Sequence, residues 1–155
     1  MKIFRILTII LTLLILSFGG LMFWKASKSH STPAKVGLSN GQLKACGSKP
    51  NCVSSSADKN SKFYIAPFAA DNIEAAWDNL NIMLPDMGFK MALNQDKYIH
   101  ATAQTSLLKF VDDIEFHLDT ANGLIHFRSQ SRVGYSDMGA NRKRIESIKN
   151  RLAQL

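Results

Sequence analysis

The sequence has few cysteines and lacks the common catalytic and nucleotide-binding signatures. Its 155 residues include two cysteines, too few for a scaffold of several disulfides or for a four-thiolate zinc site. The motifs G-x-x-x-x-G-K-[ST], G-x-G-x-x-G, H-E-x-x-H and G-x-S-x-G are absent, so nothing indicates a common nucleotide-binding protein, zinc protease or α/β hydrolase. With 46% hydrophobic and 20% charged residues, the chain is not wholly disordered. Its length fits one folded domain.

The longest apolar run lies at the amino end. The uncharged segment 6–24 would span roughly 28 Å as a helix, close to the hydrocarbon core of a bilayer. Trp24 beside Lys25 is typical of an interfacial anchor. A cleaved signal peptide is the alternative, but no A-x-A site follows the apolar run. We therefore predict a membrane anchor over residues 1–25 that contacts the bilayer through residues 6–24, and cleavage stays open.

The two cysteines bear on the compartment. Cys46 and Cys52 enclose the turn-forming residues 47–51, which can bring two sulfurs together. A disulfide needs an oxidising compartment and therefore predicts export, whereas two free thiols in a cytosolic domain are the alternative. Basic residues flank the apolar segment almost equally, so the positive-inside rule leaves the orientation open. We predict a single-pass protein of the bacterial inner membrane with its carboxy-terminal domain in the periplasm.

Composition divides the remaining chain into two parts. Residues 26–44 are rich in Ser, Lys, Gly and Thr and are predicted to form a flexible stalk before a single domain over residues 45–155. Beyond residue 25 the chain has 16 basic and 12 acidic residues, a net charge of +4. That mild excess does not require a nucleic-acid partner, and we predict none.

Hydrophobic periodicity predicts an α+β domain. A helix begins at Asp71 as the N-cap, with Glu74 completing a capping box, and ends at Pro85. A second helix covers residues 141–152. Strand-like runs occupy residues 89–93, 98–103, 108–119 and 124–132. We expect an antiparallel sheet of about four strands packed against these two helices, preceded by the transmembrane helix.

The last two strands predict a specific hairpin. Asn122-Gly123 favours a two-residue type I′ turn, which pairs residues whose numbers sum to 245 and places Asp113 opposite Arg132. In this register one sheet face carries charged pairs and the other apolar pairs. We expect the charged face to be a solvated surface of cross-strand ion pairs.

Three separated blocks resemble a known family. Residues 50–55, residues 110–116 and residues 128–145 are similar to the signature of the domain-of-unknown-function family DUF1499, with Ala140 where valine is more usual. The resemblance extends over roughly residues 43–152. It implies an envelope or plastid protein, in agreement with export, and it implies no activity, because none is established for the family.

Catalysis and metal binding are not indicated. Ser129 and Ser131 lie on the opposite predicted face from the strand histidines, which makes a Ser-His-Asp triad geometrically poor. A metal site on His117, Asp119 and His126 is disfavoured because an arginine faces the first histidine. We therefore predict no catalytic residues, no cofactor and no metal.

Anion binding is better supported by the sequence. The segment 128–145, called here the Arg/Ser motif, combines arginines with Ser-, Gly- and Asn-rich backbone before a helix, which suits phosphate or carboxylate. Its candidate ligand-binding residues are Ser129, Ser131, Arg132, Ser136, Asn141, Arg142 and Arg144. The alternative is structural, with Asp112, Asp113 and Asp137 pairing these arginines internally or capping the helix.

Two functions stay open at this point. The first is a membrane-anchored accessory or binding domain of the cell envelope that recognises a protein partner or an anionic head group through the Arg/Ser motif. The second is an enzyme acting on an anionic substrate, with the motif as its active site. A filled, fully paired network would favour the first, and a pocket at the motif would favour the second.

Overall fold

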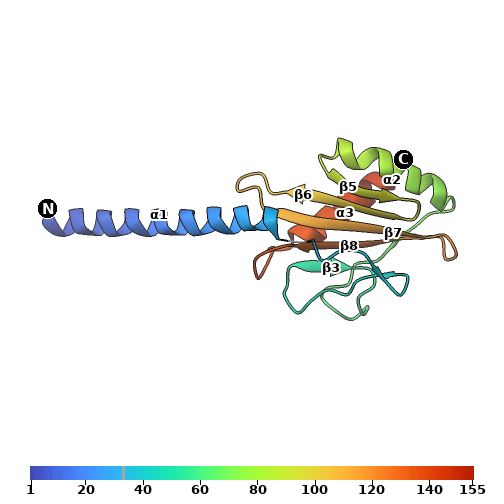
Figure 1. Ribbon diagram of the computed structural model, residues 1–155, viewed down its shortest axis with the longest axis horizontal. Helices are drawn as coiled ribbons and strands as arrows, with labels where there is room; N and C mark the ends of the chain where they lie inside the picture. Colours follow the sequence, from blue (N-terminus) through green and yellow to red (C-terminus); the bar gives the residue numbers. More distant parts are fainter. Residues whose placement is uncertain (33) are drawn as a thin grey trace.

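A long amino-terminal helix extends from an α+β domain in the computed structural model, which describes residues 1–32 and 34–155 (Figure 1). The elements in chain order are α1 (Lys2–Ser31), β1 (Leu38–Ser39), β2 (Gln42–Leu43), β3 (Cys52–Ser54), β4 (Phe68–Ala69), α2 (Ile73–Asp86), β5 (Lys90–Gln95), β6 (Tyr98–Gln104), β7 (Val111–Asp119), β8 (Leu124–Ser131) and α3 (Ala140–Leu152).

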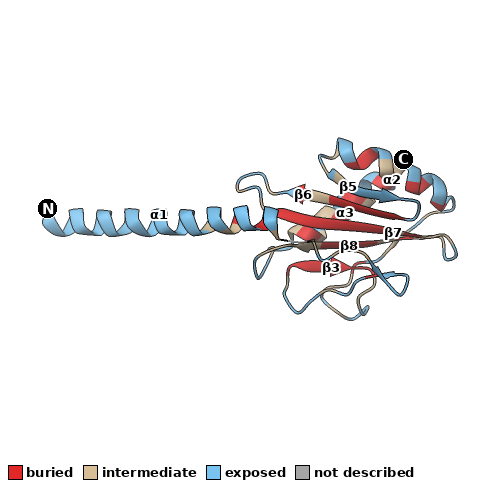
Figure 2. Ribbon diagram, in the orientation of Figure 1, coloured by how far each residue is buried: buried red, intermediate tan, exposed pale blue. Residues whose placement is uncertain are grey.

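Helix α1 is long and apolar enough to cross a bilayer. None of its most apolar stretch is buried inside the protein, and large side chains such as Phe18 and Phe23 are exposed (Figure 2). A signal sequence near the amino end has the same properties, so length and composition support an anchor or a signal segment alike.

The sheet is antiparallel and has six strands rather than the predicted four or so. Its order is β3-β8-β7-β6-β5, and β4 pairs with another part of β8. The expectations of an α+β class and an antiparallel sheet are confirmed. Strands β3 and β4 were missed because they contain only three and two residues, too few for a period-two pattern to be recognised. A separate small hairpin joins β1 and β2.

Helices α2 and α3 cover one face of this sheet, called here the helix face. Six residues of α2 at helical spacing are buried: Ile73, Ala76, Trp77, Leu80, Met83 and Leu84. The N-cap is Asn72 rather than Asp71, since the Asn72 Oδ1 accepts a hydrogen bond from Ala75 N at 3.0 Å. Pro85 lies inside the last turn and does not end the helix, which continues to Asp86.

The β7–β8 hairpin has the predicted faces but a different register. Asp113 pairs with Gln130 and Phe116 with Phe127, a shift of two residues that leaves every side chain on its predicted face. The turn is the longer loop 120–123, because the Asp119 carboxylate accepts hydrogen bonds from the Asn122 backbone N and side-chain Nδ2 at 3.1 and 2.7 Å. The predicted two-residue turn and the Asp113–Arg132 strand pair are therefore wrong.

The opposite face of the sheet, called here the second face, is buried, contrary to the expected solvated surface. Glu115 is fully buried, and Arg128 and Asp113 are 3% and 4% exposed. Most of β7 is buried, as Figure 2 shows, and β8 contains both buried and half-buried residues. The charged pairs of this face are therefore shielded from water, which strengthens them and raises the penalty for breaking one.

Residues 26–44, predicted as a flexible stalk, provide much of this cover. The Ser29 hydroxyl, fully buried at the end of α1, accepts a hydrogen bond from Val111 N at 3.0 Å. Gly37 N donates to Glu115 Oε1 at 2.6 Å, and Leu43 is 3% exposed. The segment is thus attached to the sheet at several points along its length, whereas Pro33, which the stalk prediction includes, lies outside the described residues.

Candidate functional site

Asn141, at the start of α3, is the centre of a polar cluster on the helix face. Its Oδ1 accepts hydrogen bonds from Ser129 Oγ and Arg144 NH1, both at 2.6 Å. Its Nδ2 donates to Asn51 O at 3.0 Å and to Ser131 Oγ at 3.1 Å. Asn141 is fully buried, and both of its amide hydrogens and both oxygen lone pairs have partners. We call Asp112, Ser129, Ser131, Asn141 and Arg144 the helix-face network.

An ion pair closes this network. Arg144 NH2 donates to Asp112 Oδ2 at 2.7 Å, and Arg144 NH1 also reaches Ser129 Oγ at 3.1 Å. Asp112 is 3% exposed and Ser129 is fully buried. The structure thus brings together Asp112 and four of the predicted ligand residues as a filled cluster that ties β7 and β8 to α3.

The other predicted residues of the turn before α3 also have internal partners. Asp137 accepts hydrogen bonds from Gly139 N at 3.0 Å and Asn141 N at 2.8 Å, so its carboxylate caps α3. The Ser136 hydroxyl accepts from Met138 N at 3.2 Å. Gly139 has φ +81°, a left-handed conformation that other residues adopt only with strain, and it turns the chain into the helix.

Arg142 points away from the helix-face network. Its NH2 donates to the carbonyl oxygens of Lys62 at 2.9 Å and Tyr64 at 2.7 Å. These bonds fix the chain between β3 and β4 against α3. Arg142 was predicted to bind a ligand, but in the structure its side chain binds the backbone of a neighbouring loop.

The second face carries a separate set of charges, centred on Glu115. This carboxylate accepts hydrogen bonds from Arg128 NH1, from the Tyr98 hydroxyl at 2.7 Å and from Gly37 N at 2.6 Å. Burial and the hydrogen bond to Glu115 raise the pKa of Tyr98 far above its ordinary value, so its hydroxyl stays protonated and remains a donor. Arg128 also contacts Gln130 Oε1 and donates to Lys35 O at 3.2 Å.

Arg132 belongs to the second face, and the structure separates it from the serines with which the sequence grouped it. Its Nε and NH2 donate to the two Asp113 oxygens at 2.9 and 2.8 Å. His100 Nε2 lies 2.8 Å from Asp113 Oδ1. Burial alone would raise the pKa of Asp113, but the hydrogen bonds from His100 and Arg132 outweigh it and hold that pKa below its usual value. The same pair raises the pKa of Arg132.

A cavity of about 230 Å³ lies on this face, beside the end of α1. Its walls include Lys35, Lys49, Arg128 and Arg132, and Asp113 is the acidic residue among the lining residues. Residues 47–49 of the disulfide loop also line it. Arg128 is 3% exposed, and its Nε has no hydrogen-bond partner in the described part of the chain. The Arg128 Nε–H group is therefore a buried hydrogen-bond donor of the second face that has no acceptor among the described residues.

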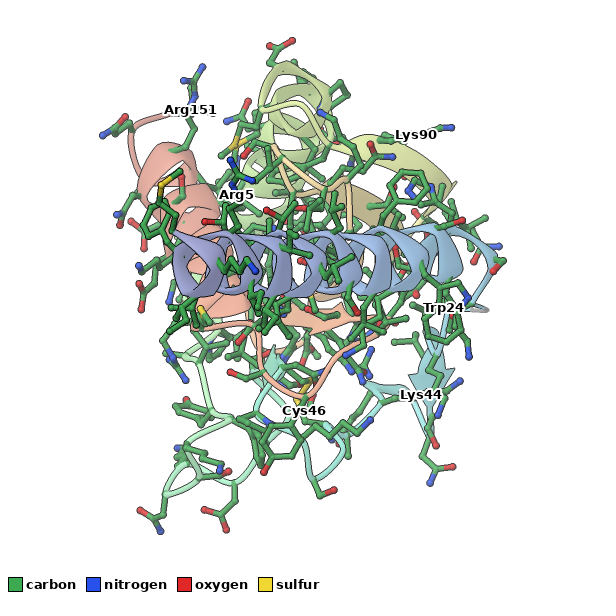
Figure 3. All side chains as sticks on the ribbon, turned by 90° about the vertical axis from the view of Figure 1, so that its left-hand side faces the viewer. Arg5, Trp24, Lys44, Cys46, Lys90 and Arg151 are labelled. Carbon is green, nitrogen blue, oxygen red and sulfur yellow. A yellow bond between two sulfur atoms is a disulfide. The ribbon has the colours of Figure 1, made fainter. Side chains whose placement is uncertain are left out.

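The disulfide that positions one wall of the cavity joins Cys46 to Cys52, with the two Cα atoms 5.7 Å apart. The predicted disulfide is therefore confirmed in the structure, and it fits an extracytoplasmic domain. Figure 3, which faces the end of the molecule that carries α1, shows Cys46 on one side of α1, with Lys90 and Arg151 on the other. Sequence reasoning missed Lys35 and Lys49 as cavity residues because both lie outside the Arg/Ser motif, which contained all the candidate ligand-binding residues.

A serine–histidine contact that the sequence reasoning missed lies at the other end of the second face. Ser55 Oγ is 3.1 Å from His126 Nδ1, and His126 Nε2 is 3.8 Å from Asp119 Oδ2. The Ser55 oxygen also accepts a hydrogen bond from Phe127 N at 2.9 Å, so this hydroxyl holds the chain after β3 against β8. Across residues 1–32 and 34–155, no three His, Cys, Asp or Glu side chains are arranged to hold a metal ion.

The three sequence blocks that resembled DUF1499 now have structural positions. Residues 50–55 supply Asn51 and β3, residues 110–116 open β7, and residues 128–145 form the end of β8 and the start of α3. Residues 42–152 match the family described as "Protein of unknown function (DUF1499)". The chain belongs to the DUF1499 family. Comparisons with curated proteins and with solved structures give no match. The DUF1499 match contains the helix-face network and the disulfide, whereas Lys35 precedes it.

Proposed function

We propose that this DUF1499 protein is a membrane-anchored binding domain of the bacterial cell envelope, with its folded part in the periplasm, and that it holds a phosphate group in the cavity beside α1. The observation that carries the proposal is the charge of the cavity wall. Four basic side chains line it, and the buried Arg128 among them has an unpartnered Nε. Such a wall favours an anion.

The acidic groups of the second face neutralise two of the four basic side chains of this wall. Asp113 is paired with Arg132 and His100, and Glu115 with Arg128. Lys35 and Lys49 form no ion pair within the described ranges, so the four basic side chains exceed the two carboxylates by two charges. A bound phosphate, with about two negative charges near neutral pH, would balance that excess.

Cavity size and location support a small phosphate group. Sites for drug-sized molecules usually enclose about 300–1,000 Å³, and this cavity encloses about 230 Å³. Thr32, directly after α1, is one of its lining residues. If α1 spans the membrane, the cavity lies close to a layer of lipid phosphates, so a lipid head group and free phosphate are the two sources of the same chemistry.

The Arg/Ser motif supports a binding domain over an enzyme at that motif. Ser129, Ser131, Asn141 and Arg144 are engaged with one another and with Asp112. Ser129 is fully buried, and its hydroxyl donates to an amide oxygen rather than to a general base. The motif thereby supports β8, which carries Arg128 of the cavity wall and is followed directly by Arg132.

Calorimetric titration of the full chain in a non-ionic detergent tests this proposal, with inorganic phosphate and glycerol phosphate as probes. We expect the wild type to bind, and a Lys35→Gln/Lys49→Gln variant to lose at least about tenfold in affinity, because each removed charge weakens a short-range contact. The matched control is Lys59→Gln/Lys143→Gln, which removes two exposed charges outside the cavity lining.

The outcomes distinguish a lipid head group from free phosphate as the ligand, and they distinguish the cavity variant from its control. Tighter binding of glycerol phosphate identifies a lipid head group as the ligand, and equal affinities identify free phosphate. Absence of binding by the wild type, or an equal loss in the control variant, contradicts the proposal.

A further inference from the structure

Two loops at the α1 end of the domain expose large apolar side chains. The loop between β6 and β7 carries Leu107, which is 86% exposed. The loop between β8 and α3 carries Tyr135 and Met138, which are 72% and 93% exposed. Figure 1 shows both loops projecting from the end of the domain at which α1 leaves it. Exposed apolar side chains gathered at one end of a domain indicate a contact surface.

The opposite end of the sheet has a different character. The β5–β6 turn consists of Asp96 and Lys97, and the β7–β8 loop runs from Thr120 to Gly123 through Asn122. These turns are polar and small, as is usual for solvent-exposed hairpin connections. Exposed apolar side chains are therefore a feature of the two loops at the α1 end, and the two turns at the opposite end do not share it.

Both apolar loops are held in place by hydrogen bonds. Lys109 N donates to Thr105 O at 3.1 Å, and Phe110 N donates to Thr105 Oγ1 at 3.0 Å. His30 Nε2, near the end of α1, is 2.9 Å from Lys109 O, which ties the first loop to the helix. The second loop is fixed by the Asp137 cap described above. The domain thus presents these side chains in a defined arrangement.

The short distance between the apolar part of helix α1 and the domain indicates that these loops face the membrane. Trp24 is exposed, whereas Ala26 is 3% exposed, so the first buried residue of α1 comes two residues after the predicted interfacial tryptophan. Two helical residues rise about 3 Å, less than the roughly 5–7 Å depth of one head-group layer. With residues 6–24 in the hydrocarbon core, the end of the domain lies in or against that layer.

Charge agrees with an anionic lipid surface. Lys28 and Lys109 are exposed at this end, and Lys25 directly follows Trp24. Lys28 Nζ lies 5.1 Å from the centre of the Trp24 ring, a pairing suited to the interface, where an amphipathic ring and a cation both find favourable surroundings. Basic residues near an anionic leaflet are attracted to its surface.

We propose that the β6–β7 and β8–α3 loops form a bilayer-docking surface for the membrane that holds α1. Leu107, Tyr135 and Met138 insert at the boundary between head groups and acyl chains, and Lys25, Lys28 and Lys109 contact lipid phosphates. The domain then rests on the bilayer in one orientation instead of swinging on its anchor. This inference does not depend on the phosphate cavity, because it uses different residues.

Paramagnetic relaxation in nanodiscs tests the docking surface directly. The full chain is placed in phosphatidylcholine–phosphatidylglycerol nanodiscs that contain a lipid with a gadolinium chelate on its head group, and amide relaxation is measured by NMR. We expect Leu107, Lys109 and Met138 to relax several-fold faster than Lys97 and Asn122 at the opposite end. Equal enhancement at the two ends, or none at either, overturns the proposal.

A variant with its own control separates insertion from mere proximity. Leu107→Ser/Tyr135→Ser/Met138→Ser is expected to lose most of the enhancement at these loops while the remaining spectrum shows a folded domain. The control Ile82→Ser/Leu93→Ser replaces apolar side chains that are exposed on α2 and β5, and it should keep the enhancement. Unchanged enhancement in the triple variant, or an equal loss in the control, contradicts docking through these side chains.

Discussion

The two faces of the sheet bury polar groups in different ways. On the helix face, Asn141 has four hydrogen-bond partners and the Asp112–Arg144 pair closes the cluster. On the second face, the Glu115–Arg128 pair is as deeply buried, yet the Arg128 Nε has no partner in the described part of the chain and a cavity lies beside it. Burial alone therefore does not distinguish a structural cluster from a binding site. The second face differs in having one buried donor without a partner, on an arginine that also lines a cavity.

The difference also reflects what covers each face. The helix face is closed by α2 and α3, which bring apolar side chains of a regular pattern. The second face is closed by the irregular segment before β3 and by the disulfide loop, which bring backbone groups such as Gly37 N and Lys35 O. Irregular cover leaves a gap where regular helices would pack tightly.

The largest expected effect comes from breaking the buried pair of the second face. Arg128→Met leaves the fully buried Glu115 without its charged partner and should lower the free energy of unfolding by about 3–5 kcal/mol, measured by urea denaturation. The double variant Arg128→Met/Glu115→Met should recover a large part of that loss. A single variant as stable as the wild type would show that the pair is not shielded from water.

The helix-face network should respond next most strongly. Asn141→Ala removes the partners of Ser129, Ser131 and Arg144 together, and we expect a loss of about 2–3 kcal/mol in the same measurement. Asn150→Ala, at an exposed position of the same helix, is the matched control and should change stability by less than about 0.5 kcal/mol. Equal effects of the two substitutions would contradict the role given to Asn141.

The disulfide should have an intermediate effect on stability and a separate effect on the cavity. Cys46→Ser/Cys52→Ser opens a short loop, which should cost about 2 kcal/mol by the chain-entropy estimate. Because residues 47–49 line the cavity, phosphate affinity should fall as well. Thiol labelling of the unreduced wild type tests whether the disulfide is present, and reaction at both cysteines would contradict it.

The smallest effect concerns pH. The pKa of Asp113 is lowered in the folded protein, so this carboxylate stabilises the fold above its unfolded pKa of about 3.9. That contribution is lost as the pH falls through the lower, folded value. Asp113→Asn should therefore lower stability at pH 7 and flatten the fall in stability below about pH 4, as measured by thermal unfolding at a series of pH values. A parallel pH dependence in wild type and variant would contradict the Asp113 pairing.

The helical part of the fold was predictable because helical spacing is a strong local signal. The apolar residues that recur at helical spacing in α2 and α3 are buried, among them Leu80 and Leu84 of α2 and Ile145, Ile148 and Leu152 of α3. The register of the β7–β8 hairpin was harder to predict from the sequence. A shift of two residues preserves both faces, so alternation cannot distinguish the true register from the predicted one, and the Asp119 contacts that set the loop are specific to its geometry.

The candidate site was only partly predictable for a related reason. The motif identified the serines and Asn141, which face the helices, and it identified Arg132, which faces the other way. The sequence cannot show that a stretch rich in Ser, Lys and Gly folds back over the second face, because its cover depends on backbone groups rather than on a pattern of side chains. Lys35 and Lys49 became visible only with that fold.

The most direct test of the contrast between the two faces measures thermal stability with and without inorganic phosphate for one variant of each face. For Ser129→Ala, in the helix-face network, we predict a lower melting temperature and an intact rise on adding phosphate. For Lys49→Gln, in the cavity wall, we predict an unchanged melting temperature and a loss of that rise. The opposite result, with the phosphate response lost in Ser129→Ala and retained in Lys49→Gln, would place the anion site in the helix-face network and contradict the account.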